Sequence, residues 1–173
     1  MKAKKALVFI VVMAMAVPAA ADAWTISTHY LRLNEAGPGG NTNNLGIAAS
    51  YDWELNPCLT FAVEALGSWD NPAELYGGGI NMKWHLAPWG KVNLYGGGYA
   101  DYVHARGLPS VAQGGTGGSE DGLIYGPLVG VRIPLTERTA FFSQYQYGFI
   151  DFGTLRRAFD EANWLVFGLE MKF

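Results

Sequence analysis

The residues of this sequence that could do chemistry are charged and imidazole side chains that recur at every second position of several segments. They are Asp52, Glu54, Glu64, Lys83, His85, Arg132, Glu170 and Lys172. Four acids and three bases on one face could neutralise one another as an internal ion-pair network, or they could carry protons or ions along a path. We favour the network, because such a set neutralises its own charge.

Other site chemistries find less support. The three histidines, His29, His85 and His104, fall on different segments and lack the spacing of metal ligands. A glycine-rich repeat, at 75–79 and 94–98, would need a following helix to present its amides to a phosphate, and no helix is indicated there. The sequence therefore predicts neither a metal site nor a cofactor site.

The alternation of apolar and polar residues defines the elements that carry the charged set. From Leu45 to Leu55 every second residue is apolar or aromatic, over eleven residues. That length is typical of a tilted membrane strand. The same period recurs at 59–69, 76–86, 92–102, 123–133, 141–149 and 164–173, and a less regular segment at 24–33 makes eight.

The connectors between these segments alternate in length. Short ones at 56–58, 87–90 and 134–138 each contain a proline, whereas longer ones occupy 34–44, 70–74, 106–122 and 151–161. This arrangement predicts an all-β, eight-stranded antiparallel up-and-down transmembrane barrel, with short turns in the periplasm and long loops outside. Pro127, within the sixth segment, predicts a bulge or a local gap in strand pairing.

Composition and residue placement favour a membrane barrel over a soluble one. Half of the residues are hydrophobic, 14% are aromatic and 16% are charged, which argues against disorder. A soluble sandwich or ligand-binding barrel would also alternate, but here it would bury the charges and expose the aromatic rings. Aromatic residues at both ends of the segments predict two interfacial girdles: Trp53, Trp84 and Trp89 beside the short turns, and Trp69, Tyr76 and Tyr102 opposite.

The first 23 residues have the pattern of a cleaved secretory signal peptide. Three lysines precede an unbroken apolar run from Ala6 to Ala21, and Ala21-Asp22-Ala23 supplies a cleavage site. The run is shorter than a membrane-spanning helix requires, and Pro18 lies where a signal peptide usually breaks its helix. We expect residues 1–23 to be removed and residues 24–173 to form the barrel domain.

The expected mature chain is acidic. Loss of three lysines and one aspartate changes the formal net charge from −3 to −5, which leaves no basic surface for nucleic acid. The single cysteine, Cys58, excludes an intrachain disulfide although export would permit one.

The chain ends with Gly168, Met171 and Phe173 at the spacing Gly-x-x-apolar-x-aromatic. These residues resemble the C-terminal signal by which the barrel assembly machinery recognises outer-membrane barrels. Together with the eight segments, they make the mature chain resemble the small outer-membrane barrels typified by the transmembrane domain of outer-membrane protein A. The resemblance implies the cell outer membrane as location, with its lipid, lipopolysaccharide and the assembly machinery as partners, and a monomer.

An eight-stranded barrel has an interior that side chains just fill. We therefore expect a structural or surface-interactive protein with a filled lumen and long extracellular loops, without catalysis or a cofactor. Lipid A deacylases of this size carry His-x-Ser on the penultimate strand beside an acid. Here that strand reads Ser143-Gln144-Tyr145-Gln146, without histidine. A lipid A hydrolase, a narrow channel and a carrier of apolar molecules through a lateral opening are the alternatives.

Two surface features have two interpretations each. Arg156 and Arg157, in the last long connector, could bind lipid A phosphate or pair with neighbouring acids. On the outward face, a groove for an acyl chain or a partner barrel could form at Gly78, Gly96 and Gly98. The inward glycines of the same repeat are Gly77, Gly79 and Gly97. We expect them to make room for Tyr95 and Tyr99 and to let the wall bend.

Overall fold

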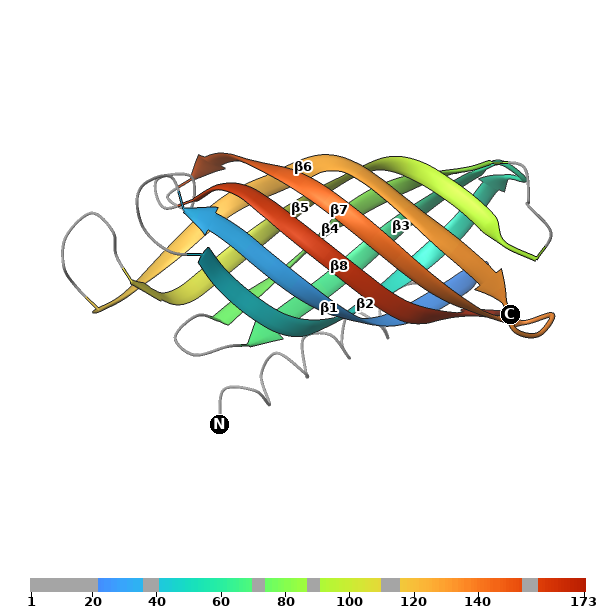
Figure 1. The fold of residues 1–173 in the computed structure, drawn as a ribbon, viewed down its shortest axis with the longest axis horizontal. Coiled ribbons are helices and arrows are strands. Elements are labelled where there is room, and N and C mark those ends of the chain that lie inside the picture. Colours follow the sequence, from blue (N-terminus) through green and yellow to red (C-terminus); the bar gives the residue numbers. More distant parts are fainter. Residues whose placement is uncertain (1–21, 36–40, 70–73, 87–90, 110–115, 154–158) are drawn as a thin grey trace.

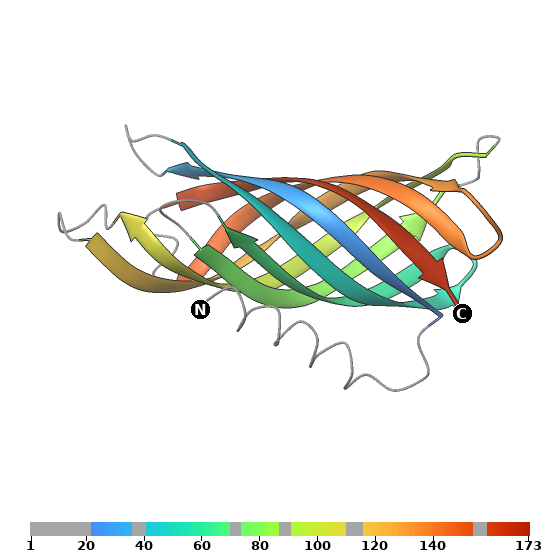
Figure 2. The same cartoon turned by 90° about the horizontal axis from the view of Figure 1, so that it is seen from below.

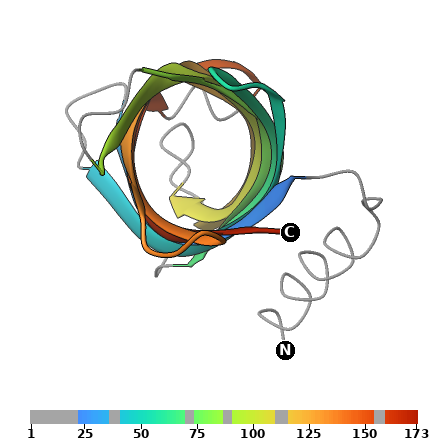
Figure 3. The ribbon, with the colours of Figure 1, turned by 90° about the vertical axis from the view of Figure 1, so that its right-hand side faces the viewer.

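The computed structural model describes residues 22–35, 41–69, 74–86, 91–109, 116–153 and 159–173. Their eight strands are β1 (Ala23–Glu35), β2 (Asn41–Asn56), β3 (Leu59–Trp69), β4 (Glu74–His85), β5 (Asn93–Pro109), β6 (Thr116–Pro134), β7 (Thr139–Gly153) and β8 (Phe159–Lys172). Consecutive strands pair antiparallel and β1 pairs with β8, so the sheet closes (Figures 1 and 2). Seen from one end, the strands form a ring (Figure 3). The predicted eight-stranded antiparallel barrel is confirmed.

Within the ranges just given, no helix is long and apolar enough to span a membrane.

The two ends of the barrel differ. β1 begins and β8 ends at the same end, which also carries the turns at 57–58 and 135–138 (Figure 1); we call it the turn end. We call the opposite end, where the connectors that follow β1, β3, β5 and β7 lie, the loop end. β5 and β6, of 17 and 19 residues, form the hairpin that extends furthest there.

The strands at the loop end are longer than the sequence pattern predicted. β5 runs to Pro109 and β6 starts at Thr116, inside the segment expected to be a loop, and β2 starts at Asn41. Apolar alternation stops before the strands do, because the ladder joins backbone groups and needs no side-chain pattern. β1, irregular in sequence, pairs on both sides from Ala23 to Asn34.

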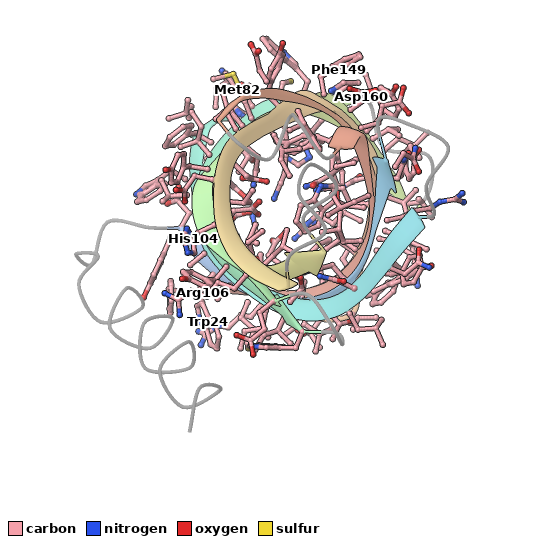
Figure 4. The ribbon with its side chains drawn as sticks, turned by 90° about the vertical axis from the view of Figure 1, so that its left-hand side faces the viewer. Trp24, Met82, His104, Arg106, Phe149 and Asp160 are labelled. Atoms are coloured by element: carbon pink, nitrogen blue, oxygen red, sulfur yellow. The ribbon has the colours of Figure 1, made fainter. Side chains whose placement is uncertain are left out.

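Side chains alternate between the outer wall and the lumen as predicted. Outward residues such as Val129, Tyr145 and Leu165 are 58%, 44% and 40% exposed, whereas their inward neighbours are buried. Met82 and Phe149 also point away from the ring (Figure 4). An exposed apolar surface that surrounds a closed barrel is the surface of a membrane-spanning barrel.

Pro127 produces the predicted gap in pairing. β6 pairs with β7 at Tyr125 and again at Leu128, in the same register, but not at Gly126 or Pro127. On its other edge Pro127 still faces Gly98 of β5. Proline has no backbone N–H to donate, so one ladder is interrupted while the other continues.

Two tyrosines enter the lumen over glycines, although not over those expected. A Cβ at Gly130 would lie 2.4 Å from Tyr95 Cζ, and one at Gly148 would lie 2.3 Å from the Tyr99 hydroxyl oxygen. Both rings lean toward β6 and β7, so the space they need lies there. At the glycines predicted for this role, an added Cβ would instead lie within 2.2 Å of a neighbouring backbone carbonyl oxygen. These glycines are Gly77, Gly79 and Gly97.

Candidate functional site in the barrel lumen

The lumen has three layers along its axis. A cavity of about 380 Å³ lies at the turn end, where Asn56 and Pro57 contribute to its wall; we call it the vestibule. A polar middle layer follows, with a cavity of about 20 Å³. The loop-end half is filled by apolar side chains. The predicted charged set lies in the first two layers.

Ion pairs close across the vestibule. Arg132 donates from Nε and Nη2 to the two carboxylate oxygens of Glu170, at 2.9 and 2.7 Å. Lys172 pairs with Glu54. A two-point contact between guanidinium and carboxylate is the strongest geometry for such a pair. The structure thus brings together these four residues of the predicted network.

The middle layer is organised around Asp52. Lys83 Nζ lies 2.9 Å from Asp52 Oδ2, and the Ser50 hydroxyl donates to Asp52 Oδ1 at 2.7 Å. The Thr25 hydroxyl lies 2.6 Å from that of Ser50. Lys83 also lies 5.9 Å from the centre of the Phe142 ring. A buried carboxylate with two donors is well compensated.

His85 lies in the vestibule wall rather than in an ion pair. Its Nε2 is 2.8 Å from the Thr60 hydroxyl, and its ring is 5.8 Å from that of Tyr95. Tyr95 in turn donates its hydroxyl to Gln144 Oε1 at 3.1 Å. His85 therefore contacts the Thr60 hydroxyl and the Tyr95 ring within the lumen wall.

Glu64 and Asp101 form a separate part of the middle layer. Asn81 Nδ2 donates to Glu64 Oε2 at 3.2 Å. Asp101 is fully buried, and neither of its carboxylate oxygens receives a hydrogen bond from a described residue. The sequence pattern places Asp101 on the inward face but gave no reason to include it in the network. Its role depends on neighbours that only the strand register brings together.

The loop-end half of the lumen is mostly apolar, although Asn44 and Ser68 are also buried there and are hydrogen-bonded to each other. Its fully buried apolar side chains have relative exposures of 0 to 2%: Leu31, Leu33, Leu75, Val103, Ile124 and Trp164. They belong to one hydrophobic cluster, which we call the plug. The charged inward side chains lie near the turn end and in the middle of the barrel, so apolar residues predominate on the inward face further along.

A third cluster lies outside the barrel at the loop end. His104 Nδ1 is hydrogen-bonded to the Asp121 carboxylate, and Arg106 Nε donates to His104 Nε2 at 3.3 Å. The Arg106 guanidinium lies 5.3 Å from the centre of the Tyr76 ring. Figure 4 shows His104 and Arg106 together on the outside of the ring. Asp101 points into the lumen, so the acid partner of His104 is Asp121.

Comparison with known proteins supports the fold. No family model and no curated protein matches the sequence. Neisserial surface protein A matches in structure with a TM-score of 0.67 and 19% identity, over 87% of this chain and 99% of that one. The attachment invasion locus protein Ail of Yersinia pestis gives 0.59, 16%, 87% and 97%. The chain has the fold of the small outer-membrane β-barrels.

A third small outer-membrane barrel shows how widely this fold tolerates sequence change. The N-terminal β-barrel domain of OprF from Pseudomonas aeruginosa matches with a TM-score of 0.58 and 11% identity, over 88% of this chain and 98% of that one. Identities this low carry the fold only. The lumen contacts of this chain must therefore be interpreted from its own residues.

For some predicted site residues the structure does not test the predicted role. Arg156 and Arg157, Trp89 and residues 1–21 lie outside the described residues. Gly168 faces the lumen, where a Cβ would lie 2.7 Å from the Phe142 ring, and Phe173 is 77% exposed. The assembly role of the chain end stays a prediction.

Two of the outward glycines, Gly96 and Gly98, leave the outer wall of the barrel shallow. A Cβ at Gly96 or Gly98 would meet only one carbonyl oxygen, at 3.7 or 3.6 Å, whereas one at Gly78 would lie 2.6 Å from Glu64 O. Packing therefore accounts for glycine at position 78 but not at 96 or 98.

Across the described ranges, no three His, Cys, Asp or Glu side chains are grouped to hold a metal ion.

Proposed function

We propose that the chain is a structural, surface-interactive protein of the cell outer membrane whose barrel is closed to solutes and performs no catalysis. The single observation that carries this proposal is the plug. A solute entering from the vestibule reaches side chains with relative exposures of 2% or less at Leu31, Leu33 and Trp164. Moving an ion past them would strip its water without replacement, at a cost of several kcal/mol.

Conductance in planar bilayers tests the closed barrel. The wild-type protein should give no ion current. Trp164→Ala removes the largest fully buried side chain of the plug and should create the first measurable current steps. Trp84→Ala is the matched control, because Trp84 lies on the outer wall and is 56% exposed. Steady conductance in the wild type would refute the closed barrel and favour a narrow channel.

The interactive surface of the proposed protein is its loop end. Arg106 is exposed there, and its guanidinium lies against the Tyr76 ring. Tyr76 faces the residue of β5 that lies two positions beyond the outward Tyr102. A guanidinium at the edge of an aromatic girdle suits contact with lipid phosphate, including that of lipopolysaccharide. The names of two structural neighbours, a surface protein and an attachment invasion locus protein, describe those proteins and support the same class of role. We expect a monomer assembled by the barrel assembly machinery.

A lipid A hydrolase is the second candidate, because one observation favours it. His104 and Asp121 form an imidazole–carboxylate pair on the outer wall, which is half of a nucleophile-activating arrangement. However, His104 Nε2, which would accept the nucleophile's proton, takes the Arg106 N–H instead. No hydroxyl of a described side chain is hydrogen-bonded to His104. We therefore prefer the non-catalytic function.

A further inference from the structure

The first strand of the barrel begins before the residue that the sequence pattern makes the start of the mature chain. That pattern places the signal-peptide cleavage site directly before Trp24. In the structure, β1 begins at Ala23, which pairs with Asp52 of β2 and with Lys172 of β8. Ala23 is 3% exposed and lines the vestibule. A cut after Ala23 would therefore remove the first residue of a strand that is paired on both sides.

Asp22 is hydrogen-bonded to both strands that flank β1. Its backbone N–H donates to the carbonyl oxygen of Asp52 at 3.0 Å, and its carbonyl oxygen accepts the N–H of Phe173 at 3.3 Å. Its carboxylate oxygen Oδ2 accepts the backbone N–H of Glu54 at 2.6 Å. The start of β1 and the C-terminal end of β8 lie side by side at the turn end (Figure 2). Asp22 thus joins β2 to β8 where the barrel closes.

The ion pair of Lys172 with Glu54 lies across the same point. Lys172 belongs to β8 and Glu54 to β2, so the pair bridges the two neighbours of β1. Because Ala23 faces Lys172 in the β1–β8 ladder, the start of β1 lies between the two partners. Asp22 fixes the backbone of one of them through the N–H of Glu54. A chain that began at Trp24 would lack this support beneath the pair.

The sequence offers a second cleavage site two residues earlier. Ala19-Ala20-Ala21 has the same pattern of small residues as Ala21-Asp22-Ala23. Small residues before the cut are what a signal peptidase site requires, so the pattern alone permits both cuts. The fold distinguishes them, because only the earlier cut leaves β1 and the hydrogen bonds of Asp22 complete.

We propose that signal peptidase cleaves the precursor between Ala21 and Asp22, so that Asp22 is the first residue of the mature protein. One water molecule is consumed when this peptide bond is hydrolysed, which leaves a carboxylate on Ala21 and a free α-ammonium group on Asp22. That ammonium group keeps its hydrogen bond to the carbonyl oxygen of Asp52, and a charged donor strengthens such a bond. Asp22 is exposed, so its charges stay hydrated. The proposal depends on export of the chain and not on whether the barrel conducts.

The mature protein itself gives the decisive test. The full precursor should be expressed in a Gram-negative host, and the protein extracted from its outer membrane should be analysed by intact mass spectrometry and N-terminal sequencing. We expect one chain that begins Asp-Ala-Trp-Thr. A chain that begins at Trp24, at any other residue, or at the uncleaved Met1 would overturn the proposal.

Two precursor variants distinguish the two cuts by the rate of processing. Ala19→Phe places a large side chain within the proposed site and outside the alternative one, so it should slow processing several-fold. Ala23→Val places a branched side chain directly before the alternative cut, so processing should continue at the wild-type rate. The ratio of precursor to mature chain after pulse labelling measures both effects and does not require the variants to fold. Slow processing of Ala23→Val with normal processing of Ala19→Phe would overturn the proposal.

The contribution of Asp22 to barrel closure can be measured on refolded chains. Chains that begin at Asp22 and at Trp24, each freed from an N-terminal tag, should be refolded into lipid vesicles and unfolded in urea. The shorter chain should unfold at a lower urea concentration, because it lacks all the hydrogen bonds of Asp22 and the pairing of Ala23. Asp22→Ala in the longer chain loses only the bond to Glu54 and should fall between the two. Equal midpoints for the three chains would contradict a role of Asp22 in barrel closure.

Discussion

Lys83 and Asp52 join two strands that are not neighbours, because the Lys83 Nζ of β4 lies 2.9 Å from Asp52 Oδ2 of β2, inside the lumen. Their side chains are only 11% and 6% exposed. β3 lies between these strands in the wall, so the pair braces the barrel across its curvature. A buried pair of this kind costs little when it is complete and much when one partner is removed.

Removal of one partner of this pair should therefore be costly. Lys83→Met leaves Asp52 with only the Ser50 hydroxyl, and it should destabilise folding by about 3 to 5 kcal/mol in urea titrations in lipid vesicles. The double variant Lys83→Met with Asp52→Asn should recover most of that loss. Lys91→Met, at an exposed position, serves as the control. A double variant as unstable as Lys83→Met would contradict the ion-pair interpretation.

Lysine on the outer wall of β8 should destabilise the folded protein, because the side chain would face the membrane. Phe167 and Leu169 are 42% and 46% exposed on the outward face. Lysine at either position should cost about 2 to 4 kcal/mol at the bilayer midplane and about 0 to 1 kcal/mol near an interface. Phe167 lies further from the turn end, so Phe167→Lys should cost more. Equal folding free energies for both variants and the wild type in lipid vesicles would exclude a lipid-facing surface here.

Gly168 should be sensitive to size rather than to charge. A Cβ there would lie 2.6 Å from Ile26 O and 2.7 Å from the Phe142 ring. Gly168→Ala should therefore destabilise folding by about 1 to 3 kcal/mol through overpacking. Gly96→Ala is the matched control, because its Cβ would meet only Leu128 O at 3.7 Å and should be nearly neutral. The reverse order of the two effects would contradict the assignment of inward and outward faces.

The native cysteine can report the orientation of the barrel. Cys58 is exposed in the turn that follows β2, at the turn end. A membrane-impermeant maleimide should not label it in intact cells and should label it once the outer membrane is permeabilised. A cysteine introduced at position 112, with Cys58 replaced by serine, should react in intact cells. Labelling of Cys58 in intact cells would reverse the topology.

The absence of catalysis can be tested at the residues nearest to a hydrolase pattern. Ser143 lies on the outer wall, His29 is buried in the lumen beside Trp164, and His104 is bonded to Asp121. Alanine at each position should leave the acylation of lipid A in the host envelope unchanged, as measured by mass spectrometry. A lipid A mass that depends on His104 would instead establish the hydrolase.

The fold of this protein could be predicted from its pattern of residues. Strict alternation over segments of membrane-strand length, with connectors of alternating length, specifies strand number, neighbour order and the face of each side chain. Even the gap at Pro127 could be predicted, because a missing N–H is a local property. Opposite charges on one face predicted that ion pairs such as that of Arg132 with Glu170 would form, although the individual partners could not be assigned.

The pairs of inward residues that meet in the lumen could not be predicted in this way. Lumen contacts join strands that are distant in sequence, and they depend on register and on barrel curvature, which the period of two does not specify. For this reason Lys83 could not be assigned to Asp52, nor Asp101 to Glu64 across Gly79, nor Tyr95 to the space over Gly130. The apolar plug also depends on closure of the barrel, because Leu31, Leu33 and Trp164 come from strands whose inward side chains meet only across the lumen.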